Sequence, residues 1–291
     1  MEKQTHLKQP TKKNEMNIEN IIEQDKLINL ENNRIYNFLK ESPSSKFYEE
    51  IFSESFQKNK KPELYDQVKK AHSEEGLAYK GMEEIVSYLE KELNNDSIVI
   101  EIGGGVHQQR SANAYKRFNH YFPLDISYSS IKRYTKTFNK IGFVADATEL
   151  PFKDNSIDCI FTHTFLEHPM NPEAVLNEII RVLKPNGIVV HNDAWFCRWW
   201  HRYGIIGLKK FKNMSFKEKL ISIAVMFTEI KMLRIPPIIF RRLFKIIFYS
   251  KKNVNLDYTN LKPNYYLYLG CDEDAASSID PVDVIRFYES R

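Results

Sequence analysis

The chain has 291 residues, of which 42% are hydrophobic and 27% charged, a composition typical of a globular protein with one large domain or two small ones. Its three cysteines are too few and too scattered for a disulfide framework, and no Cys/His cluster has the spacing of a metal site. The polar N-terminus lacks the apolar run of a secretory signal, and no apolar run reaches the ~20 residues of a membrane span. We therefore expect a cytoplasmic protein with no metal and no transmembrane segment.

Charge is distributed unevenly along the chain, whose formal net charge is +4. Residues 198–252 contain 14 Lys and Arg residues against two acidic ones, so this segment carries +12 and the rest of the chain −8. A strongly basic stretch on an otherwise acidic protein predicts a phosphate-rich or other anionic partner for that stretch.

The first 93 residues have a largely helical hydrophobic pattern. Residues 1–45 are rich in Lys, Asn and Glu, which predicts a polar, partly disordered arm with a single amphipathic helix. The apolar residues that recur at roughly helical spacing in this arm are Ile18, Ile21, Ile22, Ile28 and Leu30. The helical pattern continues from Phe47 to Leu93, and the polar residues 94–96 then end it.

From Ser97 the hydrophobic period changes repeatedly between strand and helix. Five short apolar runs predict strands at 97–102, 120–126, 142–145, 157–165 and 187–191. Two stretches between them, 129–138 and 172–183, predict helices, the second with Asn171 as its N-cap. The alternation predicts an α/β fold over residues 46–193, with a Rossmann-like, mostly parallel sheet that has helices on both faces and binds ligands at the carboxyl ends of its strands.

The chain after Asp193 divides into two further regions. Residues 194–254 combine aromatic, basic and apolar residues, which predicts a helical insert after the fifth strand. Residues 255–291 return to an ordinary pattern, with YYLYL at 265–269 as a candidate strand and a final helix capped by Asp280.

The first predicted strand ends in a glycine turn formed by Gly103, Gly104 and Gly105, where the backbone can approach a ligand closely. A tight turn without a ligand would have the same sequence. The first three strands also end in acidic residues, which are Glu101, Asp125 and Asp146. Together these carboxylates could accept hydrogen bonds from ribose hydroxyls and an amino group, and could balance a cationic sulfonium.

A nicotinamide dinucleotide site is the main alternative at this turn. Asp125 lies at about the ~20-residue spacing at which that site places its acidic residue. However, a GxGxxG motif counted from Gly103 requires a small residue at position 108, and Gln108 stands there. Hydride chemistry is therefore disfavoured.

Four blocks of the sequence, which cover about a third of the chain, resemble the class I S-adenosylmethionine-dependent methyltransferases. These blocks are VIEIGGG at 99–105, PLDIS at 123–127, VADATELPFKDNSIDCIF at 144–161 and LEHPMNPEAVLNEIIRVLKPNGIVV at 166–190. The resemblance is to methyltransferase type 11, in the branch that includes enzymes of ubiquinone and menaquinone biosynthesis. It implies S-adenosyl-L-methionine as the cofactor.

The resemblance also implies a role for each matching position. The positions that would contact the cofactor are Glu101, Gly103, Gly104, Gly105, Asp125, Ile126, Asp146, Ala147, Thr162 and His163. Among them, Asp125 would hold the ribose hydroxyls, Asp146 would border the adenine, and His163 would lie near the transferred methyl group. One departure is His107, which stands where the family often has a third glycine and puts the fit of this loop in doubt.

Methyl transfer from a sulfonium depends mainly on an in-line approach and the exclusion of water. If the acceptor is a hydroxyl group, a base must also remove its proton. The candidates are His163 and His168, near the end of the fourth strand, and Asp193, at the end of the fifth. Each also has a purely structural interpretation, His168 as a loop histidine and Asp193 as a cap.

The C-terminal block at 269–291, LGCDEDAASSIDPVDVIRFYESR, resembles methyltransferases found among cell-surface polysaccharide genes. This likeness implies O-methylation of a sugar or lipid-linked glycan, with a quinone-like or other small molecule as the second choice. The family's sheet usually ends with a helix and two more strands. Here those strands are either missing or replaced in part by YYLYL.

The basic insert suggests where the protein acts. FRRLFKIIFYSKK at 240–252 has the composition of a helix on an anionic membrane surface, so we expect 195–252 to make a peripheral contact at the inner face of the membrane. Nucleic acid is a weaker choice, because no known nucleic-acid-binding module accompanies the charge. A non-catalytic scaffold that keeps the fold is the remaining alternative.

Overall fold

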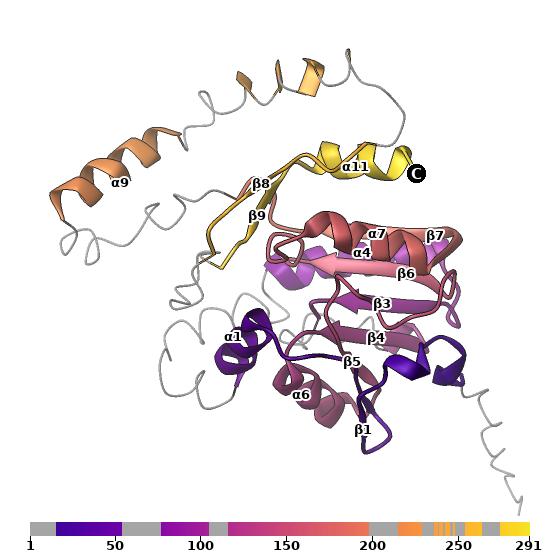
Figure 1. The fold of residues 1–291 in the computed structure, drawn as a ribbon. Helices are drawn as coiled ribbons and strands as arrows, with labels where there is room; N and C mark the ends of the chain where they lie inside the picture. Colours follow the sequence, from indigo (N-terminus) through magenta and orange to yellow (C-terminus); the bar gives the residue numbers. More distant parts are fainter. Residues whose placement is uncertain are drawn as a thin grey trace, which may run out of the picture.

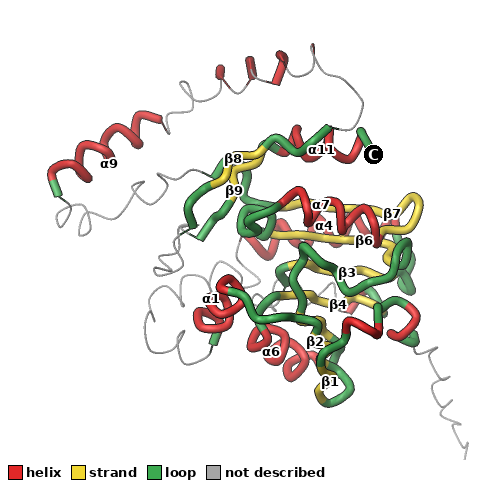
Figure 2. Tube along the Cα trace, viewed as in Figure 1, coloured by secondary structure: helices red, strands yellow, loops and turns green. Residues whose placement is uncertain are grey.

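The computed structural model describes residues 16–53, 77–104, 116–197, 215–228, 254–263 and 274–291, and single residues between 236 and 247. Its centre is a seven-stranded sheet in the order β1-β2-β5-β4-β3-β6-β7, parallel except for β1. The strands are β1 (Asn29–Glu31), β2 (Ile35–Asn37), β3 (Ile98–Ile102), β4 (His120–Asp125), β5 (Gly142–Val144), β6 (Ile157–His163) and β7 (Leu183–Asn192). Figures 1 and 2 show helices on both sides of this sheet.

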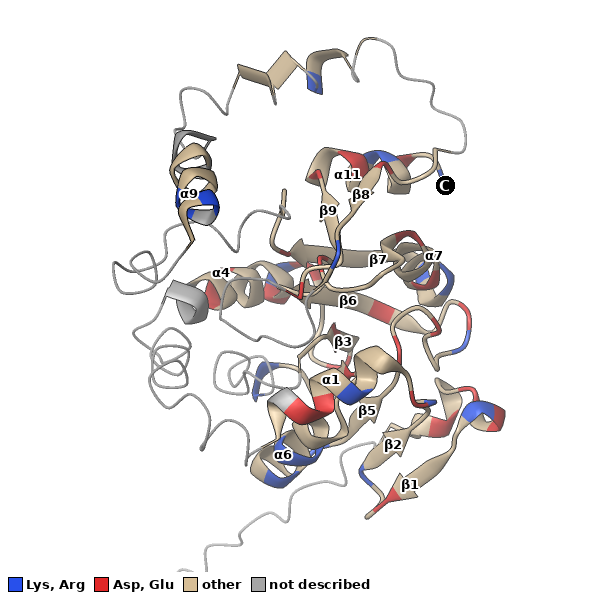
Figure 3. Cartoon of the chain, turned by 60° about the vertical axis from the view of Figure 1, so that its left-hand side comes forward, with Lys and Arg blue, Asp and Glu red and all other residues tan. Residues whose placement is uncertain are grey.

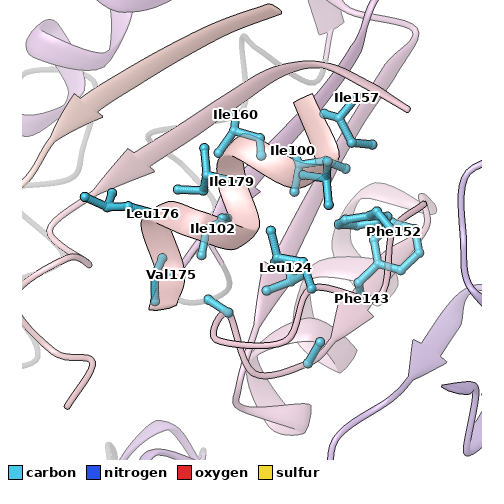
Figure 4. Close-up of a cluster of buried hydrophobic side chains, with 14 of the residues drawn as sticks. Ile100, Ile102, Leu124, Phe143, Phe152, Ile157, Ile160, Val175, Leu176 and Ile179 are labelled. Carbon is cyan, nitrogen blue, oxygen red and sulfur yellow. The ribbon is translucent and has the colours of Figure 1, made fainter. Parts of the chain in front are cut away.

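Alternate side chains of the strands pack against different helices. Helix α7 (Pro172–Val182) packs Val175 and Ile179 against Ile100 and its neighbours in one core cluster, which Figure 4 shows. On the other face, α4 (Leu77–Glu92) packs Val86 against Val99, and Tyr134 of α6 (Tyr128–Phe138) joins that cluster. The strands are therefore buried on both faces, as their unbroken apolar runs require.

The five strands predicted between residues 97 and 191 are confirmed, and so are the two helices between them. Asn171 caps α7 through a hydrogen bond from Ala174 N to its Oδ1 (3.0 Å). The fifth strand begins at Leu183 and is longer than predicted, because the chain enters the sheet directly from α7. The α/β, Rossmann-like class is thus confirmed.

The amphipathic helix predicted between residues 18 and 30 is wrong. The segment forms two short 3-10 turns (Ile18–Asn20 and Gln24–Lys26) and the β1·β2 hairpin, and β2 extends the sheet beside β5. Asn32 and Asn33 have φ angles of 52° and 54°, the conformation that a tight hairpin turn requires. Ile22 is buried against the sheet, whereas Ile28 is 56% exposed, so the helical spacing was coincidental.

Beyond β7, the described part of the chain adds no further strand to the sheet. Strands β8 (Tyr258–Asn260) and β9 (Ser277–Ile279) form a separate antiparallel pair. Helix α11 (Pro281–Glu289) follows and is capped by Asp280, as predicted. The N-terminal hairpin instead adds β1 and β2 beside β5, at the edge of the sheet opposite β7, and this completes the seven strands. YYLYL at 265–269 lies outside the described residues.

Two helices lie outside these layers. Helix α1 (Pro43–Phe52) and the β8·β9 pair lie on the side to which the strand arrowheads point in Figure 1. Helix α9 (Phe216–Thr228), which agrees with the helical insert predicted, stands apart from the sheet in the same view. Within the described residues, no helix combines the length and apolarity that crossing a membrane needs.

Candidate functional site

Strand register brings the predicted residues to one edge of the sheet. Ile102 of β3 is level with Leu124 of β4 on one side and with Thr162 of β6 on the other. Asp125 is level with Val144 of β5, two residues before Asp146. The glycine turn and the residues after each strand therefore form a continuous row at the carboxyl ends, which we call the rim. Gly105, His107 and Gln108 lie outside the described residues.

The turn after β3 has no room for side chains. Gly103 has a φ of +76°, and a Cβ atom there would lie 2.9 Å from the Phe165 ring. A Cβ on Gly104 would lie 2.6 Å from the carboxyl carbon of Glu101. The amide of Gly103 donates to Leu124 O (2.8 Å), which fixes the turn against β4. The bare backbone of this turn lies against the Glu101 carboxylate, and we call the two together the cradle.

Glu101 places a carboxylate beneath this turn. Its side chain is fully buried, and Tyr121 Oη donates to its Oε2 (2.7 Å). Burial raises the pKa of the nearby Tyr134 hydroxyl well above its ordinary value, and the charge of Glu101 raises it further. The Glu101 carboxylate is therefore the hydrogen-bond acceptor at the buried edge of the cradle, because Tyr134 keeps its proton.

Asp125 lies where β4 meets α6. Its Oδ1 accepts from the amide of Ser127 (2.8 Å), and Ser127 Oγ caps α6 by accepting from Ser130 N (3.2 Å). Glu49 of α1 accepts from Ser127 Oγ (3.0 Å) and Ser129 N (2.9 Å). The next residue, Ile126, packs against two aromatic residues of α1. Helix α1 is therefore held beside the Asp125 end of the rim.

Asp146 is fixed in the same local way after β5. Its Oδ1 accepts from Thr148 N (2.9 Å) and from Thr148 Oγ1 (2.7 Å). The amide of Ala145 donates to Asp125 O (3.1 Å), so the two acidic positions are neighbours across the strands. Ala147, the residue after Asp146, is buried and has an apolar side chain.

Asp193 anchors the loop after β6. Its Oδ2 accepts from Thr162 Oγ1 (2.6 Å), and its Oδ1 accepts from the amides of Phe165 (3.0 Å) and Leu166 (3.3 Å). Between these donors, Thr164 has a φ of 49°, a conformation that a β-branched residue rarely adopts. The carboxylate thus stabilises an unfavourable turn at the end of β6.

A second set of bonds supports Asp193 from behind. His191 Nδ1 lies 2.7 Å from Thr162 Oγ1 and 3.3 Å from Asp193 Oδ2, and its Nε2 lies 2.9 Å from Tyr288 Oη. Burial raises the pKa of Asp193, but the bonds from His191, Thr162 and Phe165 lower it more, so the pKa lies below its ordinary value. A depressed pKa and two occupied oxygens favour a positioning role over that of a base.

The two candidate histidines have different surroundings. His163 is buried, and its Nδ1 lies 2.8 Å from Asn192 Nδ2 in the neighbouring strand. His168 is 21% exposed at its side chain, and its Nδ1 lies 3.1 Å from Asp274 Oδ2. His168 is therefore partly open to solvent and has a carboxylate within ion-pair distance.

Sequence reasoning missed the residues that reach this site from distant segments, namely Tyr48, Glu49 and Asp274. Their only sequence signal was the acidic run at 272–274 and the aromatic pair at 47–48, neither of which indicates a partner. Tyr121 was also missed, although it lies on a strand that was predicted. The aromatic residues Trp199, Trp200 and Tyr203 of the insert lie outside the described residues.

Comparison with known proteins identifies the region that carries the rim. Residues 100–191 match the family described as Methyltransferase domain. An uncharacterized protein of Methanocaldococcus jannaschii is 38% identical over 117 residues, which are 38% of this chain and 49% of that protein.

Two curated relatives are named for an activity. A demethylmenaquinone methyltransferase of Clavibacter sepedonicus is 43% identical over 53 residues, 18% of this chain and 22% of that enzyme. A malonyl-[acyl-carrier protein] O-methyltransferase of a Marinomonas species is 30% identical over 105 residues, 34% of this chain and 38% of that enzyme. The chain spans about half the length, or less, of these relatives.

Proposed function

We propose that the protein transfers a methyl group from S-adenosylmethionine to a small-molecule hydroxyl. The proposal starts from its class I S-adenosylmethionine-dependent methyltransferase domain. The observation that carries the proposal is the rim, where a turn with no room for side chains adjoins three carboxylates at the ends of neighbouring strands. Parallel sheets bind ligands at this edge.

The residues of the rim fit the parts of this cofactor. The Gly103–Gly104 backbone and Glu101 would hold the methionine end, where the cationic sulfonium favours a nearby carboxylate. Asp125 and Ile126 would hold the ribose, and Asp146 with Ala147 would border the adenine. Thr162, which is level with Ile102 in the sheet, and His163, the next residue, would lie near the methyl group.

S-adenosylmethionine would supply an activated methyl carbon, so the protein's task is mainly to orient the acceptor and exclude water. Thr162 and Asp193 stabilise the loop after β6 on the methyl side. His168, on the same loop, is the residue we propose to take the acceptor's proton. His163, which is bonded to Asn192, would line the cofactor side.

Calorimetry tests the cofactor assignment. We expect micromolar binding of S-adenosylmethionine and no binding of NAD. Asp125→Ala should weaken cofactor binding by about 1.5 to 3 kcal/mol, because a charged hydrogen bond to ribose is lost. The control is Asp96→Ala, since Asp96 lies in the turn before β3 and accepts from Asn119 at the opposite edge. Binding of NAD alone would favour an oxidoreductase, and binding of neither a scaffold.

The acceptor we propose is a sugar or glycan hydroxyl, lipid-linked where the basic insert contacts a membrane. One relative, the malonyl-[acyl-carrier protein] enzyme, is by its name an O-methyltransferase, whereas the other is named for demethylmenaquinone. Transfer of a labelled methyl group to a panel of free sugars, lipid-linked sugars and quinones separates these classes. Label in the quinones alone would contradict the proposed acceptor.

The exposed apolar residues of the insert support a peripheral membrane contact. Phe216 of α9 is 78% exposed, and Phe240 and Phe244 are exposed in a segment rich in Lys and Arg. Figure 3 shows basic residues at one end of α9, where Lys217 and Lys219 lie. Aromatic and basic groups together suit an anionic lipid surface.

Vesicle co-sedimentation tests this contact. Binding to vesicles of phosphatidylserine and phosphatidylcholine should fall as salt rises, because salt screens the attraction. At a fixed salt concentration, the double variant Phe240→Ser and Phe244→Ser should bind these vesicles less than the unmodified protein does. Ile285→Ser is the matched control, since Ile285 is also exposed but lies on α11. Equal binding to pure phosphatidylcholine would contradict the electrostatic contact.

A further inference from the structure

Three distant segments meet at the carboxylate of Asp274. Tyr48 Oη, from α1, donates to Asp274 Oδ2 (2.9 Å). His168 Nδ1, from the loop after β6, lies 3.1 Å from the same oxygen. The rings of Tyr48 and His168 contact edge to face, with centroids 5.9 Å apart. One buried carboxylate therefore faces both a phenol and an imidazole.

Asp274 remains charged in this position. Burial raises the pKa of its carboxyl, but the contacts with His168 and the Tyr48 hydroxyl lower it more, so the pKa lies below its ordinary value. A carboxylate that is ionised near neutral pH favours the imidazole tautomer with the proton on Nδ1. The lone pair then lies on Nε2, on the far side of the ring.

The Nε2 side of His168 faces a second carboxylate. Glu167 Oε1 lies 3.7 Å from this nitrogen, and Glu167 is almost completely buried. The carbonyl of Glu167 accepts from the amides of Ala276 (2.8 Å) and Ser277 (3.0 Å), which fixes the loop to the C-terminal segment. The imidazole therefore lies between two carboxylates, which would stabilise its protonated form.

Helix α1 connects this histidine to the cofactor end of the rim. Tyr48 packs with Phe47 against Ile126, next to Asp125, while the adjacent Glu49 accepts hydrogen bonds at the start of α6. The same helix thus contacts the ribose side of the rim and the Asp274 carboxylate. Its position depends on both.

We infer that Asp274 and Tyr48 are positioning residues that orient His168 as the base for a hydroxyl acceptor, an inference that rests on the proposed methyltransferase function. As the acceptor oxygen bonds to the methyl carbon, the carbon–sulfur bond breaks and its electron pair stays on sulfur. The acceptor's proton passes to Nε2 of His168. The imidazolium lies between Asp274 and Glu167 until it loses this proton to water.

Histidine NMR tests the orientation without a known acceptor. In protein labelled at its histidine nitrogens, with His168→Gln to assign the signal, the imidazole of His168 should be an Nδ1–H tautomer. Asp274→Asn should move its titration midpoint to lower pH by about one unit or more, because a charge within ion-pair distance is lost. Tyr48→Phe should shift the same titration midpoint by a smaller but measurable amount. This second variant tests the inference even if Asp274→Asn disturbs the loop.

Tyr288→Phe is the matched control, because Tyr288 contacts a different histidine, His191. It should change the His191 signal and leave His168 unaltered. A titration of His168 that neither Asp274→Asn nor Tyr48→Phe changes would overturn the inference.

Calorimetry with S-adenosylhomocysteine separates this inference from the proposed function. Asp274→Asn should bind this ligand within a few-fold of the unmodified protein, because Glu49 still holds α1 at Ser127 and Ser129 on the ribose side. Failure of the unmodified protein to bind it would contradict the proposed function itself. Normal binding together with an unaltered His168 titration would contradict only the orienting role.

Discussion

The rim and the His168 cluster are built in different ways. At the rim, Asp125 and Asp146 are each fixed by a partner two residues away, Ser127 and Thr148, and Glu101 is fixed by Tyr121 of the neighbouring strand. In the His168 cluster, the partners come from α1 and from the C-terminal segment, and Tyr48 and Asp274 are 226 residues apart. The side proposed for the cofactor thus depends mainly on local contacts, whereas the side proposed for the acceptor depends on long-range docking.

This difference predicts which changes affect which half of the reaction. A change of Asp125 or Asp146 should reduce cofactor binding without displacing distant segments, since each of these carboxylates accepts from a residue two positions away. A change that loosens the loop after β6 should disturb the acceptor side first, because Glu167 and His168 are fixed there by residues far along the chain.

The largest effect should come from Asp193, whose carboxylate stabilises that loop. Asp193→Ala should lower the free energy of unfolding by about 3 to 5 kcal/mol, because buried donors on Thr162, Phe165 and Leu166 lose their acceptor. Denaturant titration measures the loss. A change below about 1 kcal/mol would show that the loop keeps its conformation without the carboxylate.

The same residue gives a dependence on pH. The pKa of Asp193 is lower in the folded protein than the ordinary 3.8, so its ionised form stabilises the fold above that pH. This contribution is lost as the pH falls below the ordinary value and approaches the folded one. Stability should therefore fall more steeply below pH 3.8 in the unmodified protein than in Asp193→Asn.

The next largest effect concerns the N-terminal segment, which forms part of the core. Ile22→Ala should lower the free energy of unfolding by about 2 to 4 kcal/mol, because Ile22 is buried against the sheet beside Phe152. Ile28→Ala is the control from the same segment and should change it by less than about 0.5 kcal/mol, since Ile28 is exposed. Equal losses would contradict the burial of Ile22 and the exposure of Ile28.

Much of the sheet and the rim could be predicted from the sequence because their signals are local. The apolar run before Gly103 predicts β3, and parallel topology then places the residue after each strand at the same edge. Asp125 and Asp146 therefore reach the rim without any knowledge of tertiary contacts. Asn171 and Asp280, as helix caps, were equally predictable.

The remaining features depend on contacts that no local pattern specifies. The hairpin at residues 29–37 escaped prediction because the spacing of Ile18, Ile21 and Ile22 resembled a helix, although Asn32–Asn33 is a turn signal. Asp274 meets His168 only after the C-terminal segment pairs with the loop at Glu167.

A smaller effect should separate cofactor binding from folding at the rim. Gly104→Ala should weaken S-adenosylmethionine binding by about 10- to 100-fold, because the added Cβ would collide with Glu101 and displace the cradle. Gly81→Ala is the matched control: Gly81 lies in α4 with open space around its Cβ position, and alanine favours a helix. Calorimetry should show normal affinity for this control and a large loss for Gly104→Ala.

The smallest effect should come from Arg242, which joins the basic insert to α11. Its Nη2 lies 3.1 Å from Asp280 Oδ1, and its guanidinium lies over the Phe196 ring, 5.5 Å from the centroid. Arg242→Met should lower the free energy of unfolding by about 1 kcal/mol, because Asp280 still accepts from Val282 N after the ion pair is lost. Asp280→Ala should lower it more, since the helix cap is lost as well. If Arg242→Met lowered the free energy of unfolding as much as Asp280→Ala does, the ion pair rather than the cap would hold α11. The C-terminal segment would then depend on long-range contacts at this end too.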